Sequence, residues 1–149
     1  MELVENSLEC SLDTFLDRPL FCFVAALSRT GKPRISPLWY LWEDDSIWII
    51  GDTVGKSYVS RIERRPETAV AIVDFDVHSG LVQHVGMRGE SAVVPLEEGR
   101  VFRLLRRYLG PDEDEWDPRF AELDPERWAF LRFDPETVVA RDQSFVPSL

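Results

Sequence analysis

The residue types best suited to ligand chemistry lie where an expected strand leads into an expected helix. Gly51 ends the largely apolar run of residues 46–51, and Gly55 and Lys56 follow at the start of a helix expected over residues 56–65. Backbone N–H groups at a helix start, together with a lysine, can hold a phosphate. A lysine at the positive end of a helix is unfavourable unless an anion lies there, which favours a binding role for Lys56. The spacing therefore predicts a site for a phosphorylated cofactor.

A second set of candidates lies on the preceding strand, expected over residues 33–42. Ser36 and Leu38 share one face of it, because side chains alternate along a strand. Pro37 lacks a backbone N–H, so we expect it at a sheet edge or a bulge, where ligands often approach the backbone. Arg34 is either a ligand for the phosphate or an exposed residue in a surface ion pair.

Other reactive residue types carry weaker signals. The aromatic side chains of the two strands favour burial in a core or an interface, and Trp39 is the one expected near a bound ring. The two histidines, His78 and His84, have no cysteine or carboxylate at a recognisable metal-binding spacing, so no metal site is predicted. No combination of nucleophile and base emerges, and the catalytic residues stay unassigned.

A mainly β domain must position these candidates. Short apolar or alternating segments predict strands over residues 21–28, 33–42, 46–51, 69–74, 82–95, 129–133 and 137–141. Helical spacing predicts helices over residues 6–17, 56–65, 96–109 and 118–127. Tight breaks separate the first three strands, so we expect them to form an antiparallel meander. Regularly spaced strands point to a barrel or a sandwich rather than to βαβ units.

Composition sets wide limits on function. The 149 residues fit one domain, and a net charge of −10 argues against nucleic-acid binding, which needs a basic surface. Neither a signal peptide nor a membrane span is recognised, so a cytoplasmic location is expected. The acidic run at residues 111–117 is expected as a solvated loop, paired with the arginines of the helix over residues 96–109. Cys10 and Cys22 lack a C-x-x-C spacing, and Cys22 lies in an apolar run.

Several motifs occur in a recognisable order. They are a G-x-P-x-x-S-P strand at residues 31–37, a lysine-headed helix ending in R-R-P at residue 66, and a later strand closing on Gly89. This order resembles the pyridoxamine 5′-phosphate oxidase-like split β-barrel superfamily, which includes flavin-binding and deazaflavin-binding oxidoreductases. The resemblance covers roughly residues 12–95, with a weaker match at residues 133–140.

The resemblance implies a fold and an assembly. The fold is mainly β with flanking helices (α+β), a six-stranded antiparallel split β-barrel. The assembly is a homodimer with FMN in a groove at the subunit interface. Residues 1–149 would form a single FMN-binding domain, with its core over roughly residues 12–95 and helices and strands of a C-terminal part over residues 96–149.

The resemblance also implies the residues that bind the cofactor. They are Arg34, Ile35, Ser36, Pro37, Leu38, Trp39, Ile50, Gly51, Gly55, Lys56 and His84. The first six would line the isoalloxazine and phosphate sides of the groove, and the next two would form its wall on the following strand. Gly55 and Lys56 would meet the phosphate, while His84 stands where the oxidase tends to carry a glutamine that contacts the flavin.

Two departures argue against the oxidase itself. Trp39 occupies a position where the oxidase has a lysine, and its C-terminal substrate-binding pattern is missing after Arg132. We therefore expect a divergent FMN-binding oxidoreductase that acts on an unknown small molecule. One alternative is a deazaflavin-dependent reductase of the same fold, for which Arg61, Arg64 and Arg65 would supply a longer basic groove. Another is a non-catalytic flavin-binding or interaction module.

Overall fold

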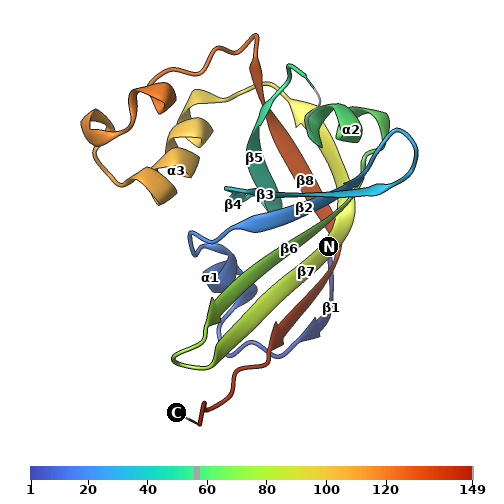
Figure 1. The fold of residues 1–149 in the computed structure, drawn as a ribbon, viewed down its shortest axis with the longest axis vertical. Coiled ribbons are helices and arrows are strands. Elements are labelled where there is room, and N and C mark those ends of the chain that lie inside the picture. Colours follow the sequence, from blue (N-terminus) through green and yellow to red (C-terminus); the bar gives the residue numbers. More distant parts are fainter. Residues whose placement is uncertain (56–57, 149) are drawn as a thin grey trace.

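The structure, a computed structural model, describes residues 1–55 and 58–148. Within this part of the chain the strands are β1 (Glu2–Asn6), β2 (Cys22–Leu27), β3 (Pro33–Leu38), β4 (Leu41–Glu43), β5 (Ser46–Asp52), β6 (Glu67–Asp76), β7 (Leu81–Val94) and β8 (Trp128–Asp142). The helices are α1 (Leu12–Leu16), α2 (Tyr58–Arg64), α3 (Glu98–Leu109) and the 3₁₀ turns η1 (Glu113–Glu115) and η2 (Pro118–Phe120). All strands belong to one curved sheet (Figure 1).

The sheet has the order β3-β2-β6-β7-β8-β5-β4, and β1 adds to β8. All pairs are antiparallel except β1 with β8. The mainly β split-barrel fold with flanking helices is therefore confirmed. The described residues form eight strands rather than six, because β1 and the three-residue β4 add to the expected set.

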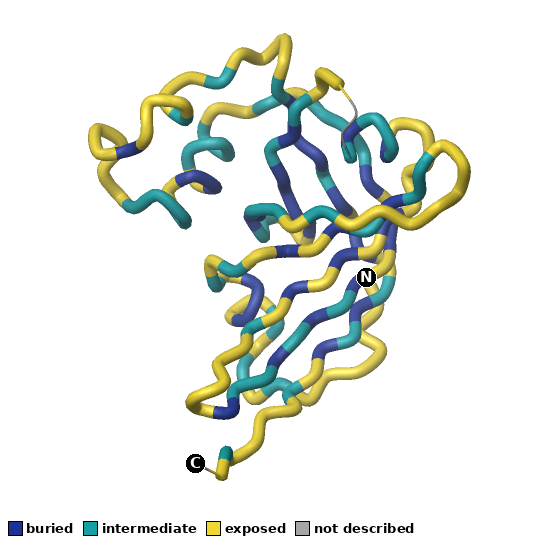
Figure 2. Tube along the Cα trace, viewed as in Figure 1, coloured by how far each residue is buried: buried dark blue, intermediate teal, exposed yellow. Residues whose placement is uncertain are grey.

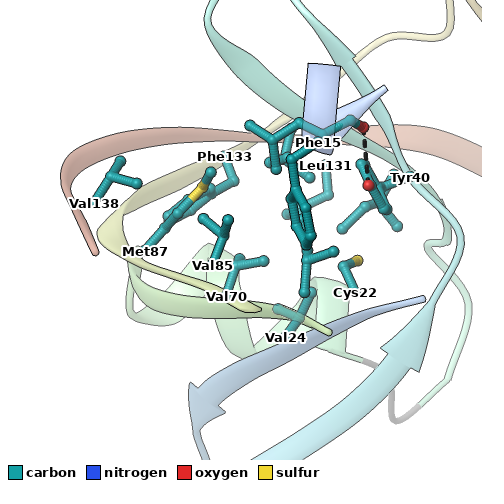
Figure 3. Close-up of a cluster of buried hydrophobic side chains, with 14 of the residues drawn as sticks. Phe15, Cys22, Val24, Tyr40, Val70, Val85, Met87, Leu131, Phe133 and Val138 are labelled. Carbon is teal, nitrogen blue, oxygen red and sulfur yellow. Dashed lines mark hydrogen bonds between the residues drawn. The ribbon is translucent and has the colours of Figure 1, made fainter. Parts of the chain in front are cut away.

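Strand alternation builds the barrel core. Along β6, buried Thr68, Val70 and Ile72 alternate with exposed residues, and this pattern is visible along the tube in Figure 2. The buried side chains converge with those of β7 and β8 and with Phe15 of α1 (Figure 3). Phe133 at the centre is fully buried. Alternation is thus what turns one face of the sheet into a closed apolar interior.

The N-terminal helix is shorter than expected. Residues 2–6 form β1, an exposed strand, and α1 begins only after Ser11, whose hydroxyl accepts a hydrogen bond from the Thr14 N–H at 3.1 Å. Asn6 instead receives the Leu8 N–H on its side chain at 3.0 Å. The prediction of a helix from residue 6 was wrong, because these local side-chain bonds hold residues 6–11 outside the helix.

The expected three-strand meander was also wrong. β3 pairs with β2 alone and forms a sheet edge, which confirms the position predicted for Pro37. At Tyr40 the backbone N–H leaves the sheet and donates to the Tyr108 hydroxyl at 3.1 Å. The chain then turns through Asp44 and Asp45, at φ of 53° and 54°, and β5 pairs with β8. The break at residues 39–40 therefore separates two hairpins instead of continuing one meander.

The C-terminal part differs from the sequence prediction in two respects, and the second affects the site. One strand, β8, replaces the two strands expected, with a register shift opposite Gly89 that accommodates Pro135. Residues 118–127 contain only η2 in place of the expected helix. The segment before β8 is therefore free to lie across α3. None of the described helices is long and apolar enough to cross a membrane.

Candidate functional site

An apolar pocket of about 400 Å³ lies where β3 ends, between β5, α3 and the segment that precedes β8; we name it the β3–β5 pocket. Its lining residues are Phe21, Pro37, Leu38, Trp39, Ile49, Ile50, Leu104, Leu105, Arg119, Phe120, Leu123 and Trp128. Arg119 is the one charged member of this set, and its Nε lies 3.3 Å from Asp117 Oδ1. Such a lining suits a flat apolar or aromatic group.

Four of the predicted site residues meet in this pocket. They are Pro37, Leu38, Trp39 and Ile50. β3 and β5 are not hydrogen-bonded neighbours, so the fold brings these residues together from two separate parts of the sheet. From the sequence, only the resemblance to a family placed these residues in one site.

Trp39 is held rigidly at the pocket wall. Its ring stacks on Tyr108 with centroids 4.7 Å apart and an interplanar angle of 1°, and on Phe120 at 5.8 Å. The Tyr108 hydroxyl donates to Leu20 O at 2.7 Å, which anchors the stack to the loop before β2. Trp39 therefore presents a fixed aromatic edge to the pocket.

Tyr40 continues this support on the core side. Its hydroxyl donates to Leu16 O at 2.9 Å and to Arg18 O at 3.0 Å, and burial raises its pKa well above the ordinary value. Arg107 Nη2 donates to the same two carbonyls, and its guanidinium lies 5.1 Å from the Tyr40 ring centroid. The neutral phenol thus ties the β3–β4 connection, and Arg107 ties α3, to the end of α1 and the loop after it.

The two glycines of the predicted phosphate region serve different needs. A Cβ at Gly51 would come within 2.5 Å of Val59 Cγ2, so glycine permits close packing of α2 on β5. Gly55 has φ of +91° and open space around the Cβ position, so glycine relieves the backbone there. Neither glycine lines the pocket. Lys56, the predicted phosphate ligand, lies outside the described residues.

Arg34 and Ser36 point to the same side of β3 as Leu38. Paired residues of antiparallel strands share a face, and Arg34 and Ser36 oppose Ala26 and Val24, which are buried on the core side. Arg34 is exposed and, among the described residues, forms no ion pair; its Nη1 donates only to Pro33 O at 3.3 Å. The second alternative for Arg34, a surface ion pair, is therefore not found among the described residues.

Ile35 and His84 lie on the opposite face of the sheet. Both line a groove of about 560 Å³ over β2, β6, β7 and β8, which we name the outer groove. His84 opposes Val73 and Arg141 in register, and its Nε2 lies 3.2 Å from Gln143 Oε1. Within one chain these two residues are thus separated from the β3–β5 pocket by the sheet.

Sequence reasoning did not identify the back wall of the pocket. Leu104 and Leu105 belong to an apolar stripe that predicted the helix but not its docking surface. Phe120 ends the short η2 turn and Leu123 lies in the irregular chain after it, and the apolar residues of this segment show no period. The available signal was the density of aromatic residues after residue 115, which is high for an exposed acidic segment.

The basic face of α3 has different partners from those expected. Arg100 Nε lies 2.6 Å from Glu43 Oε2, Arg103 Nε lies 2.8 Å from Glu43 Oε1, and Arg107 Nη1 lies 3.2 Å from Asp17 Oδ1. The arginine bonds hold the pKa of Glu43 below its usual value. The expected pairing with the acidic run at residues 111–117 was wrong, because these arginines face the β4–β5 turn and α1.

The described residues contain no group of three or more histidine, cysteine or carboxylate side chains that could hold a metal ion. Cys10 and Cys22 are both free thiols. Burial raises the pKa of Cys22 to about 12, so this thiol stays protonated at neutral pH.

Comparison with known proteins identifies the family. The family model described as pyridoxamine 5′-phosphate oxidase matches residues 8–140, so the chain belongs to this family. This confirms the predicted relationship. No curated protein matches the chain at a significant level of sequence similarity.

Solved structures share the fold at low sequence identity. A conserved hypothetical protein from Mycobacterium tuberculosis is 19% identical over 95% of this chain and 89% of its own, with a TM-score of 0.74. An F420 reductase is 21% identical over 88% and 98%, with a TM-score of 0.67. An FAD-binding protein from Mesorhizobium loti is 19% identical over 93% and 96%, with a TM-score of 0.66. At this identity the likeness concerns the fold.

Proposed function

We propose that this chain is a homodimeric flavoprotein that binds FMN at the β3–β5 pocket and catalyses a two-electron oxidoreduction of a small molecule. The observation that carries the proposal is the convergence of Leu38, Trp39 and Ile50 on one apolar pocket in a member of this family. Flat apolar walls with few polar groups are what an isoalloxazine ring requires.

The surroundings of the pocket fit the polar parts of a flavin. β3 is an edge strand, so backbone N–H and C=O groups on its free side are available to the ring. Arg34 has no ion pair among the described residues and shares the core-side face of β3 with Leu38, so its charge is available to the phosphate. We assign Lys56 to the same phosphate on the sequence argument alone.

A bound flavin would supply hydride transfer, and the protein's residues would supply position and shielding. Trp39, fixed against Tyr108 and Phe120, would set the depth at which a ring can enter. Leu104 and Leu105 of α3 would exclude water from the opposite side. These roles need no catalytic acid or base within the pocket, whose single charged member, Arg119, is paired with Asp117.

The outer groove supports the homodimer. Phe23, Ile35, Val73 and Phe75 lie on the outer side of adjacent strands with exposed fractions of 36%, 67%, 41% and 61%. An apolar face of this kind on a single chain is typical of an interface. We propose that a second copy covers it, and that His84 contributes to the cofactor groove through this contact.

A deazaflavin cofactor is the second candidate, because the fold is shared with an F420 reductase as well as with an FAD-binding protein. The two candidates are distinguished by incubating the purified protein with FMN or with the deazaflavin, desalting it and recording its visible absorption spectrum. We expect FMN bands with a shifted or structured envelope. Retention of the deazaflavin but not of FMN would show that the site binds the deazaflavin instead.

The dimer has a separate test. Ile35→Glu should convert the dimer to a monomer in light scattering after size-exclusion chromatography, because it places a charge in the covered face. An unchanged mass, or a wild-type protein that is already monomeric, would contradict the assembly.

The phosphate contact is tested by a second variant. Arg34→Ala should weaken FMN binding about tenfold without changing the mass of the dimer, because a charge-assisted contact with phosphate is lost.

Turnover distinguishes the enzyme from a non-catalytic module. The flavin-loaded protein is mixed with NADH or NADPH under anaerobic conditions, and bleaching of the flavin band is followed. Reduction by either donor supports the oxidoreductase. A protein that holds flavin but reacts with neither donor is the result expected for a flavin-binding module.

A further inference from the structure

The acidic segment that precedes β8 does not simply extend into solvent. Trp116 is buried, its Nε1 donates to Gly110 O at 2.9 Å, and its ring stacks on Phe102 at 5.7 Å. These contacts fold residues 111–125 back along α3. The sequence motif that was expected to be a solvated loop therefore builds a surface of its own.

This surface is a groove of about 780 Å³ between α3 and the returning segment, which we name the α3 groove. Its apolar lining includes Val101, Phe102, Leu105, Trp116, Phe120 and Leu123. Its charged lining residues are Glu98, Glu113, Asp114 and Glu122. No lysine, arginine or histidine of the described chain lines it.

α3 separates its charges in space. Arg100, Arg103 and Arg107 turn away from the groove to the carboxylates of the β4–β5 turn and of the segment after α1. The four groove carboxylates form no ion pair among the described residues, and all four belong to exposed residues. Phe120 already stacks on Trp39 and has the Arg119 guanidinium 5.1 Å from its ring centroid. The groove thus combines the aromatic side chain of Phe102 with carboxylates that have no ion-pair partner among the described residues.

We propose that the α3 groove binds a small organic cation, a molecule with an apolar or aromatic body and a protonated or quaternary amine. Aromatic faces attract cations by their quadrupole, and nearby carboxylates add a Coulomb term. Phe102, half-buried and with one face stacked on Trp116, supplies an aromatic face, and the carboxylates at the rim supply the charge.

The dimensions favour a small molecule over a peptide. The lining of α3 runs from Glu98 to Leu105, which corresponds to about 10 Å of helix axis. An amphipathic peptide helix needs anchor positions over at least two of its own turns and a groove of matching length. The volume of about 780 Å³ lies instead in the range of small-molecule sites.

Isothermal titration with benzyltriethylammonium tests the proposal, and the uncharged benzyl tert-butyl ether serves as the matched ligand. We expect the cation to bind at least tenfold more tightly than the ether, and added NaCl to reduce the difference. Equal affinity for the two ligands, or no binding of the cation, would overturn the proposal. Tighter binding of a basic amphipathic peptide with no binding of the small cation would also overturn it.

Two sets of variants locate the site. The triple variant Glu98→Gln, Glu113→Gln and Glu122→Gln should lose at least tenfold in cation affinity. The control carries the same charge change away from the groove, at Glu9→Gln, Glu63→Gln and Glu90→Gln, which are exposed residues. The cation affinity of this control should change less than twofold. An equal loss of affinity in both triple variants would show that the effect depends on net charge alone, and would refute the assignment of the site.

Phe102→Leu tests whether the aromatic ring contributes to cation binding. Leucine keeps an apolar side chain of similar reach but has no π face, so the cation should lose more affinity than the ether. An equal loss for both ligands would contradict the cation–π contribution. The proposal does not rest on the flavin assignment, because every one of these titrations is made on the protein without added cofactor.

Discussion

The barrel core and the aromatic cluster beside it are built differently. The barrel core, centred on Phe15, Val85 and Phe133, is closed, and its central side chains are fully buried. The aromatic cluster around Trp48, Leu104, Trp116 and Phe130 has half-buried neighbours that also line the β3–β5 pocket and the α3 groove. We therefore expect stability to depend mainly on the first region and the proposed ligand binding mainly on the second.

The largest effect expected from this comparison is on stability. Phe133→Ala should lower the free energy of unfolding by about 3–5 kcal/mol, because it leaves a cavity at a fully buried position. Urea unfolding followed by circular dichroism measures it. Val77→Ala is the control, since Val77 is 57% exposed in the β6–β7 turn and should change stability by less than about 0.5 kcal/mol. Similar losses in both variants would contradict the special role of the core.

A smaller effect is expected where the two regions meet. Tyr40→Phe removes the hydroxyl, whose single proton is shared between Leu16 O and Arg18 O, but Arg107 still donates to both carbonyls. The free energy of unfolding should therefore fall by only about 1 kcal/mol. A loss above about 3 kcal/mol would show that Arg107 does not compensate. The same urea titration provides the value.

The smallest effect concerns the ion pairs that Arg100 and Arg103 of α3 form with Glu43 at the end of β4, which we name the Glu43 clamp. This effect depends on pH. The bonds from Arg103 and Arg100 lower the pKa of Glu43 below its unfolded value of 4.5. The stabilisation is thus fully present above pH 4.5 and is lost as the pH falls through the lowered folded pKa. Because the pair lies at the surface, we expect less than about 1 kcal/mol at neutral pH.

The difference in Tm between wild type and Glu43→Gln, measured from pH 7 to pH 3, isolates this effect from the other carboxylates. It should be constant above about pH 5 and shrink below pH 4.5. A difference that stays constant down to pH 3, or that grows as the pH falls, would contradict the clamp.

Local patterns predicted the strands well and their pairing poorly. The apolar run over residues 69–74 identified β6, and the missing N–H of Pro37 identified the sheet edge. β1 carries no such signal, because all of its residues are exposed. The pairing of β5 with β8 joins residues about 80 positions apart, which no local pattern encodes.

The same reasoning accounts for the candidate site. Leu38, Trp39 and Ile50 were predicted because they lie on strands with a recognisable order of motifs. His84 and Ile35 were predicted with them, yet the face on which a residue lies depends on pairing register, and both face the outer groove. Phe120 and Leu123 lie at and after the short η2 turn, where position is set by tertiary contacts such as the stack of Phe120 on Trp39.

The central claim is that the β3–β5 pocket holds a flavin ring, and filling the pocket tests it most directly. Ile50→Trp places a large side chain in the pocket, while Val77→Trp adds the same side chain in the distant β6–β7 turn. The Kd for FMN, measured by quenching of flavin fluorescence, should rise at least tenfold in Ile50→Trp and stay within twofold of wild type in Val77→Trp. An Ile50→Trp protein that folds normally and binds FMN as tightly as wild type would contradict the account.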